Sequence, residues 1–191
     1  MLDIGGGEGA YALELKKAGY DAVVADINAE SLKVAEGNGL ATRLLKPDEN
    51  VGSKVVDTVT LIEVLEHVDD PTAFLKNAIA AARKRVLFTL PCTEAFEELF
   101  SLGLSYAHVA VSDHLWHFSY SEMKSLLDSV GCSYRLEMGD FLFPHMSMAL
   151  LRKNLRGPLG FLAMLPLRIA NRLGLVSRGV PSRFYGVIDI S

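Results

Sequence analysis

Cysteine is scarce in this sequence, and long uninterrupted apolar runs are absent. The 191 residues include only two cysteines, Cys92 and Cys132, which lie far apart and exclude a disulfide-stapled secreted scaffold or a structural zinc site made of thiolates. The longest apolar windows, residues 141–151 and 158–167, contain proline and are shorter than the roughly 20 residues of a membrane-spanning helix. We find no secretory signal at the start of the sequence and expect a cytoplasmic protein.

Low-complexity composition is also absent. Seven prolines and 16 glycines are too few for a collagen-like chain, and a 50% apolar share excludes a disordered one. A chain of this length, with 22% charged residues and a mean hydropathy of +0.24, suits one domain with a sizeable core. We therefore expect residues 1–191 to form a single globular domain.

Acidic residues are missing from one long stretch. The chain carries 19 basic and 23 acidic residues, a formal charge of −4, which argues against general affinity for nucleic acid. No acidic residue lies between Asp140 and Asp189, where the basic residues are Arg152, Lys153, Arg156, Arg168, Arg172, Arg178 and Arg183. We therefore predict a cationic segment attached to an acidic domain.

Strand and helix signals alternate along the chain. Apolar, β-branched runs predict strands at 2–4, 21–26, 41–46, 55–62, 85–90, 133–138 and 184–190. Helical spacing and capping signals predict helices at 10–18, 28–36, 70–82 and 119–130. This order predicts an α/β, doubly wound, mostly parallel sheet that binds its ligand at the carboxyl ends of the strands. Residues 141–183 form a basic insertion between the last two strands, longer than a hairpin requires.

A glycine cluster follows the first predicted strand. The pattern Gly5-x-Gly7-x-Gly9 before a helix allows close approach of the backbone to a ligand, and Asp26 ends the next strand, where it is placed to accept ribose hydroxyls. The same spacing also fits a dinucleotide fingerprint that ends at Ala10. Glu8 lies where a dinucleotide places its pyrophosphate, which a carboxylate repels.

S-adenosylmethionine fits the charge of this loop better than a dinucleotide does. It carries no phosphate, and its methionyl end holds an ammonium and a sulfonium, for which Asp3 and Glu8 are suitable neighbours. Under the alternative interpretation, both acids are solvated residues of the loop and of the helix start.

Three stretches resemble one known family. They are Leu2-Asp3-Ile4-Gly5-Gly6-Gly7-Glu8-Gly9, the acid Asp26, and Val56-Asp57-Thr58-Val59 through Glu63-Val-Leu-Glu66-His67-Val-Asp-Asp-Pro71. Residues 86–91 and 114–119 are weaker matches. Over residues 1–140, roughly, the sequence resembles class I S-adenosylmethionine-dependent methyltransferases, especially the branch of the ubiquinone-biosynthesis O-methyltransferases.

The resemblance implies a Rossmann-like sheet with an antiparallel last strand and S-adenosylmethionine as cofactor. The cofactor-binding candidates are Asp3, Gly5, Gly6, Gly7, Glu8, Gly9, Asp26, Ile27 and Glu63. In the family, one or more helices precede the first strand, whereas Met1 here begins almost at that strand. We therefore expect either that the amino-terminal lid is missing or that the chain is truncated.

An acidic and histidine-containing run follows the fourth predicted strand. In a helical turn, Glu63, Glu66 and His67 occupy positions i, i+3 and i+4 and project to one side. With His114 or His117 as a further ligand, this group suits a divalent ion. The resemblance supports this interpretation, because some branches, including small-RNA 3′-terminal 2′-O-methyltransferases, hold magnesium or manganese on a similar run. In other relatives these groups hydrogen-bond the cofactor loop or the sheet.

The same histidines are the catalytic candidates. A neutral His67, His114 or His117 can remove a proton from an attacking hydroxyl as a general base. Methyl transfer is an in-line displacement at a sulfonium, so positioning of the acceptor supplies much of the catalysis and no protein nucleophile is needed.

The basic insertion contains one amphipathic pattern. Leu165, Ile169 and Leu173 form an apolar stripe, Arg168 and Arg172 form a cationic one, and Pro166 can sit at the helix start. Three interpretations remain: a lid over an anionic acceptor, a peripheral membrane contact through 152–183 on anionic lipid, or a solvated surface helix.

These observations together predict an enzyme that methylates a small molecule, with oxygen as the favoured atom and an anionic or lipid-linked acceptor. The alternatives are a metal-assisted RNA 2′-O-methyltransferase, which the acidic domain disfavours, a nicotinamide-dependent oxidoreductase, and a cofactor-binding remnant without activity.

Overall fold

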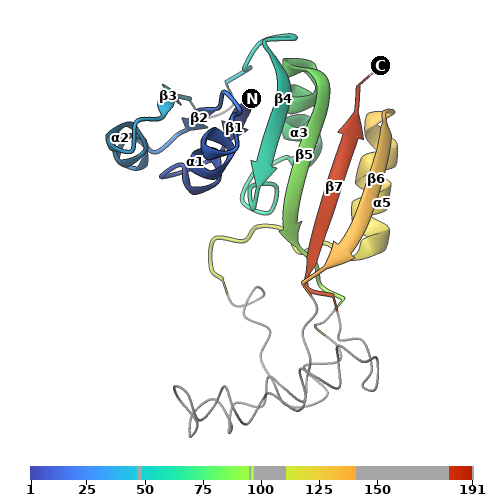
Figure 1. Ribbon diagram of the computed structural model, residues 1–191. Coiled ribbons are helices and arrows are strands. Elements are labelled where there is room, and N and C mark those ends of the chain that lie inside the picture. The colour runs from blue at the N-terminus through green and yellow to red at the C-terminus, as the bar shows by residue number, and fades with distance from the viewer. Residues whose placement is uncertain (47–48, 95, 97–110, 141–180, 191) are drawn as a thin grey trace, which may run out of the picture.

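The described part of the chain forms one mixed β-sheet with helices packed against it (Figure 1). The computed structural model describes residues 1–46, 49–94, 96, 111–140 and 181–190. The strands are β1 (Leu2–Ile4), β2 (Val23–Asp26), β3 (Ala41–Leu44), β4 (Val56–Ile62), β5 (Ala82–Pro91), β6 (Ser133–Gly139) and β7 (Arg183–Asp189). The helices are α1 (Ala10–Lys17), α2 (Ala29–Gly37), α3 (Pro71–Ala81) and α5 (Tyr120–Val130).

The strand order confirms the predicted doubly wound α/β topology. In the described residues the order is β3-β2-β1-β4-β5-β7-β6, and the pairs from β3 through β5 are parallel. Strand β7 pairs antiparallel with both β5 and β6, so the predicted antiparallel last strand is also confirmed. Chain order reverses between β1 and β4, which places the ligand-binding crevice at the carboxyl ends of these two strands.

Local capping interactions explain why the helices begin where they do. The Asp70 side chain accepts a hydrogen bond from the Ala73 amide and precedes a proline in the first turn of α3. At α5, Ser119 and Glu122 form the predicted capping box, in which each side chain bonds the backbone of the other residue.

Strand β5 is longer than its apolar pattern predicts. It begins at Ala82 rather than at residue 85, directly after α3, because the charged residues Arg83 and Lys84 both bind Asp57 on β4. Charged residues of β5 thus pair with an aspartate of β4 inside the sheet. Hydrophobic periodicity does not detect such strand residues, because it registers only apolar ones.

The core lies between the sheet and the helices α3 and α5, which Figure 1 shows on one side of β4 to β6. Phe88 and Phe184 are fully buried there. Phe88 lies over Gly186 on the neighbouring strand, where an added Cβ would be 1.8 Å from the Phe88 Cζ. A smaller cluster around Ala12, Val24 and Leu32 packs α1 and α2 against β2.

The two ends of the basic insertion meet at the carboxyl edge of the sheet. The Ser182 amide donates to the Gly139 carbonyl oxygen over 3.1 Å, and its hydroxyl donates to the Asp140 carbonyl oxygen. Residue 183, the last of the predicted insertion, is the first residue of β7. Residues 141–180, with the predicted amphipathic helix and the predicted lid, lie outside the described residues. Within those residues, no helix has the length and apolarity to cross a membrane.

Candidate functional site at the carboxyl edge

The glycine loop between β1 and α1 has a left-handed backbone at Gly5, Gly7 and Gly9. Gly9 caps α1 with a left-handed backbone, φ +82°, and an added Cβ there would lie 2.4 Å from Leu40 Cδ1. Gly7 is also left-handed, φ +54°, but an added Cβ would meet no described atom within 4 Å. The loop is therefore closely packed at the helix start and open at Gly7, where a ligand can approach the backbone.

Asp26 joins this loop to the start of α2. One carboxylate oxygen accepts a hydrogen bond from the Gly7 amide and the other from the Asn28 amide, both over 2.8 Å. Two backbone donors thus fix the orientation of a carboxylate that retains lone pairs for ligand hydroxyls. The neighbouring candidate Ile27 is 65% exposed, so its apolar side chain is available to a ligand.

Asp3 is buried beneath the loop. It is 1% exposed and accepts a hydrogen bond from the Thr60 hydroxyl over 2.6 Å. Its other carboxylate oxygen has no partner among the described residues, and an added Cβ on Gly6 would lie 2.6 Å from that oxygen. Burial raises the pKa of Asp3, the Thr60 hydrogen bond opposes this, and Asp26 adds to it. The predicted site residue Glu8 is exposed.

Glu63 does not share a helical face with Glu66 and His67. The turn after β4 is short, closed by a hydrogen bond from the His67 amide to the Val64 carbonyl over 3.0 Å. Glu63 precedes it with a left-handed backbone, φ +55°, and its carboxylate accepts from the Thr89 hydroxyl over 3.0 Å. The predicted arrangement on one face is therefore wrong, because the backbone at Glu63 is not helical.

Glu66, His67 and His114 form a group with ligand atoms all within 4.8 Å of one another. Glu66 is 1% exposed, and neither of its carboxylate oxygens has a hydrogen-bond partner among the described residues. Burial raises its pKa to about 7, with a smaller contribution from the Glu63 charge. The rings of His67 and His114 meet edge to face with centroids 4.7 Å apart, while His117 lies further from His114, at 6.2 Å.

Backbone contacts join these distant segments. The carbonyl oxygen of Glu66 accepts hydrogen bonds from the amides of Leu115 and Trp116, over 2.8 and 3.1 Å. The Nδ1 atom of His67 lies 2.9 Å from the Asp113 carbonyl oxygen. A carbonyl only accepts, so this Nδ1 donates in the neutral ring, and Nε2 is left as the basic nitrogen. His117 has the same relation to the Trp116 carbonyl, at 2.9 Å.

The residues that the sequence prediction missed are partners of the predicted ones. The hydroxyls of Thr60 and Thr89 donate hydrogen bonds to Asp3 and Glu63, respectively. Both threonines are polar residues near the carboxyl ends of buried strands, a pattern from which the sequence could have predicted them as site residues. Arg183 forms an ion pair with Glu63 over 3.2 Å, whereas the sequence grouped it with the cationic insertion. No local pattern relates residues 120 positions apart.

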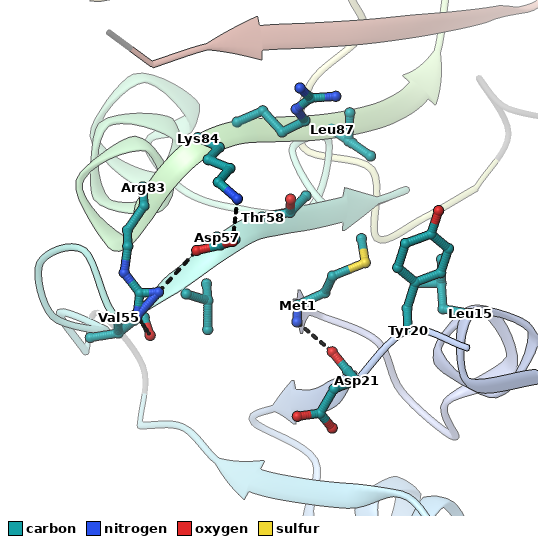
Figure 2. A pocket seen from close by; sticks show the side chains of 12 residues that line it. Met1, Leu15, Tyr20, Asp21, Val55, Asp57, Thr58, Arg83, Lys84 and Leu87 are labelled. Carbon is teal, nitrogen blue, oxygen red and sulfur yellow. Dashed lines mark hydrogen bonds and ion pairs between the residues drawn. The ribbon is translucent and has the colours of Figure 1, made fainter. Parts of the chain in front are cut away.

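A separate cavity of about 650 Å³ lies at the amino edge of the sheet (Figure 2). Its lining includes Met1, Tyr20 and Asp57, and Figure 2 shows Asp57 between Arg83 and Lys84. None of its lining residues belongs to the glycine loop or to the group around Glu66. This cavity is therefore not part of the candidate site.

Comparisons with known proteins show which family the chain resembles. A family model described as a methyltransferase domain matches residues 1–137. Ubiquinone biosynthesis O-methyltransferase from Xanthomonas oryzae pv. oryzae is 30% identical over 117 residues, which are 56% of this chain and 49% of that protein. The chain thus spans about half the length of this curated relative.

Solved structures share the fold. A SAM-dependent methyltransferase from Archaeoglobus fulgidus superposes with a TM-score of 0.69 at 17% identity, covering 99% of this chain and 85% of that one. Magnesium protoporphyrin IX methyltransferase from Synechocystis PCC 6803, solved with bound SAH, gives 0.60 at 16% identity, covering 98% and 72%. Since the methyltransferase-domain model matches most of the chain and these structures share its fold, the chain belongs to the class I S-adenosylmethionine-dependent methyltransferases.

Proposed function

We propose that this chain binds S-adenosylmethionine at the glycine loop and transfers its methyl group to an oxygen atom of a small molecule. The observation that carries the proposal is the polar cradle around Gly7: an open left-handed loop, a fixed Asp26 carboxylate and the unpartnered buried oxygen of Asp3. An ammonium group suits such an oxygen, because a buried acceptor without a donor is costly.

The residues of the chain have separate tasks in this proposal. Asp26 accepts the ribose hydroxyls, and Ile27 covers the base with its exposed side chain. S-adenosylmethionine supplies an electrophilic methyl on a sulfonium, so the protein has to position the acceptor and remove its proton. His67 is the favoured base, since its Nδ1 hydrogen bond to the Asp113 carbonyl leaves Nε2 to accept that proton.

Calorimetric titration with S-adenosylhomocysteine and with NADH tests the cofactor. We expect binding of the first at micromolar concentration or below, and none of the second. Asp26→Asn should weaken the binding of S-adenosylhomocysteine by about tenfold or more, because an amide is a poorer acceptor than a carboxylate for the two ribose hydroxyls. Asp128→Asn is the matched control, since the Asp128 carboxylate also accepts two hydrogen bonds, here from the Lys124 and Tyr134 side chains, but lies on α5. Tighter binding of NADH would support the oxidoreductase alternative and overturn the proposal.

Incorporation of a labelled methyl group tests the reaction. Metabolite pools incubated with the chain and methyl-labelled S-adenosylmethionine should yield a labelled ether or ester, and His67→Gln should reduce the yield. If the chain binds S-adenosylhomocysteine but transfers no labelled methyl group to any metabolite pool, it is a cofactor-binding remnant instead. The proposal includes an anionic or lipid-linked acceptor, because the positive charge of the basic insertion favours a negatively charged molecule. Labelled products should therefore partition with acidic or lipid fractions.

A divalent ion is the alternative to the His67 base, because an imidazole nitrogen that binds a metal cannot also accept a proton. Glu66, His67 and His114 would hold it, and two imidazoles with one carboxylate favour a transition-metal ion such as Mn²⁺ over Mg²⁺, which prefers oxygen ligands. Such an ion would polarise the hydroxyl to be methylated. Thermal unfolding with MnCl₂ should show stabilisation in the wild type and none in His114→Ala, with His117→Ala as the control. Equal stabilisation of all three proteins would exclude this site.

The group of Glu66, His67 and His114 favours a second function, metal-assisted methylation of an RNA 2′-hydroxyl. The net charge of −4 opposes it, since RNA affinity depends on cationic contacts with phosphates. A salt-dependent mobility shift of a short RNA, together with methyl incorporation into its ribose, would support this function over a small-molecule acceptor.

A further inference from the structure

Arg183 lies between two carboxylates at the carboxyl edge. Its Nε atom is 3.2 Å from a carboxylate oxygen of Glu63, and its Nη1 donates to Asp140 over 2.7 Å. Glu63 follows β4 and Asp140 follows β6, while Arg183 begins β7. A single guanidinium thus joins the ends of strands that are separated in the sheet order by β5 and β7.

Both carboxylates belong to residues with an uncommon backbone. Among the described non-glycine residues, positive φ occurs at Lys54, Glu63 and Asp140, and the last two, at +55° and +50°, are the partners of Arg183. A non-glycine residue remains in this region only where its surroundings hold it, and such residues cluster at functional sites. The fork of an arginine suits this task, because it offers several donors in one plane.

The arginine is connected to the glycine loop through Glu63. The next residue, Val64, packs on Gly5 so closely that an added Cβ on Gly5 would lie 2.6 Å from Val64 Cγ2. Glu63 is also tied to β5 by Thr89, whose hydroxyl donates to its carboxylate. A change in the backbone at Glu63 therefore reaches the loop that we assign to the cofactor.

We propose that Arg183 is a positioning residue, which holds Glu63 and the glycine loop in the cofactor-binding arrangement and anchors both ends of the basic insertion to that arrangement. This proposal rests on the proposed function for its effect on cofactor affinity. In this proposal Arg183 does not bind an anionic acceptor, because its guanidinium forms ion pairs with the carboxylates of Glu63 and Asp140.

Calorimetric titration with S-adenosylhomocysteine tests the proposal. We expect Arg183→Gln to weaken binding by about tenfold, as loss of a partly buried, charge-assisted contact would. Glu63→Gln should have a similar effect, and the double variant should bind no more weakly than the worse single variant, because both remove one interaction. Arg183→Lys should recover only part of the affinity, since an ammonium lacks the planar fork.

The matched control is Arg135→Gln. Arg135 on β6 pairs with Asp189 on β7 over 2.8 Å, so this variant removes an arginine–aspartate pair between the same two strands at the opposite edge. It should leave the affinity unchanged. Wild-type affinity in Arg183→Gln, or additive losses in the double variant, would overturn the proposal.

Amide hydrogen exchange separates this proposal from the cofactor assignment. The amides of Glu63 and His67 are hydrogen-bonded to Thr89 and Val64, and they should exchange faster in Arg183→Gln than in the wild type without any ligand. They should be unaffected in Arg135→Gln. A wild type that binds no S-adenosylhomocysteine would overturn the proposed function, whereas unchanged exchange in Arg183→Gln would overturn the role of Arg183.

Discussion

Replacement of Glu66 by glutamine should stabilise the protein at alkaline pH. The pKa of Glu66 is raised by burial to about 7 from its ordinary value of 4.5. Each unit corresponds to about 1.4 kcal/mol, so ionisation of this side chain costs the folded state about 3 kcal/mol. Between pH 4.5 and 7 the folded state binds more protons than the unfolded state, and the stability of the wild type therefore falls as pH rises through this window.

Urea unfolding at about pH 5.5 and about pH 8.5, in EDTA, measures the effect. Glu66→Gln should exceed the wild type by about 3 kcal/mol at the higher pH and by only about 1.4 kcal/mol at the lower one, which lies one unit above the ordinary pKa. The neutral amide loses no partner, because neither oxygen of Glu66 has one among the described residues. A difference that is the same at both pH values would refute this reasoning.

Glu122→Gln is the control for that experiment. The Ser119 hydroxyl and amide lower the pKa of Glu122, so this carboxylate is ionised at both pH values and contributes stability at both. The variant should be less stable than the wild type by the same amount at the two pH values. A pH-dependent difference in this control would point to a general effect of charge instead of burial at Glu66.

Three further substitutions test the fold and the site. Gly186→Ala should destabilise the protein severely, because its Cβ would lie 1.8 Å from a ring atom of buried Phe88, and soluble yield with circular dichroism reports this. Asp70→Ala removes the amino-terminal cap of α3 and should cost about 1 kcal/mol in urea unfolding. Thr60→Val removes the donor to buried Asp3, and we expect a loss of about 1–3 kcal/mol together with weaker binding of S-adenosylhomocysteine.

Matched substitutions check these expectations. Gly37→Ala places a Cβ in open space on α2 and should be neutral or stabilising, in contrast to Gly186→Ala. Thr58→Val, on the same strand as Thr60 but nearer the amino edge, should leave ligand affinity unchanged. Equal losses in each pair would show that the contacts named here are not the cause.

Local signals in the sequence were sufficient for the glycine loop and the helix starts. The spacing of Gly5, Gly7 and Gly9 requires a backbone that few other residues adopt, and the capping box at Ser119 is complete within four residues. Strand β5 was predicted too short because Arg83 and Lys84 are held in the ladder by Asp57, which lies on another strand.

The candidate site shows the limit of local signals most clearly. The sequence placed Glu63 beside Glu66 and His67 by helical spacing, but the left-handed backbone at Glu63 turns its carboxylate to Arg183. That contact joins residues 120 positions apart. The approach of His114 to His67 likewise depends on backbone hydrogen bonds to Glu66 from a distant segment.

The sequence by itself determined the alternation of strands and helices, the loop that opens the site, and the acids placed within the first strand and at the end of the second, because each depends on neighbours along the chain. Only the tertiary structure decided which carboxylates are buried, which are paired and which lie together with histidines. Burial and pairing are set by segments that the sheet brings into contact, and the same long-range contacts set the pKa of Glu66 and the surroundings of Arg183.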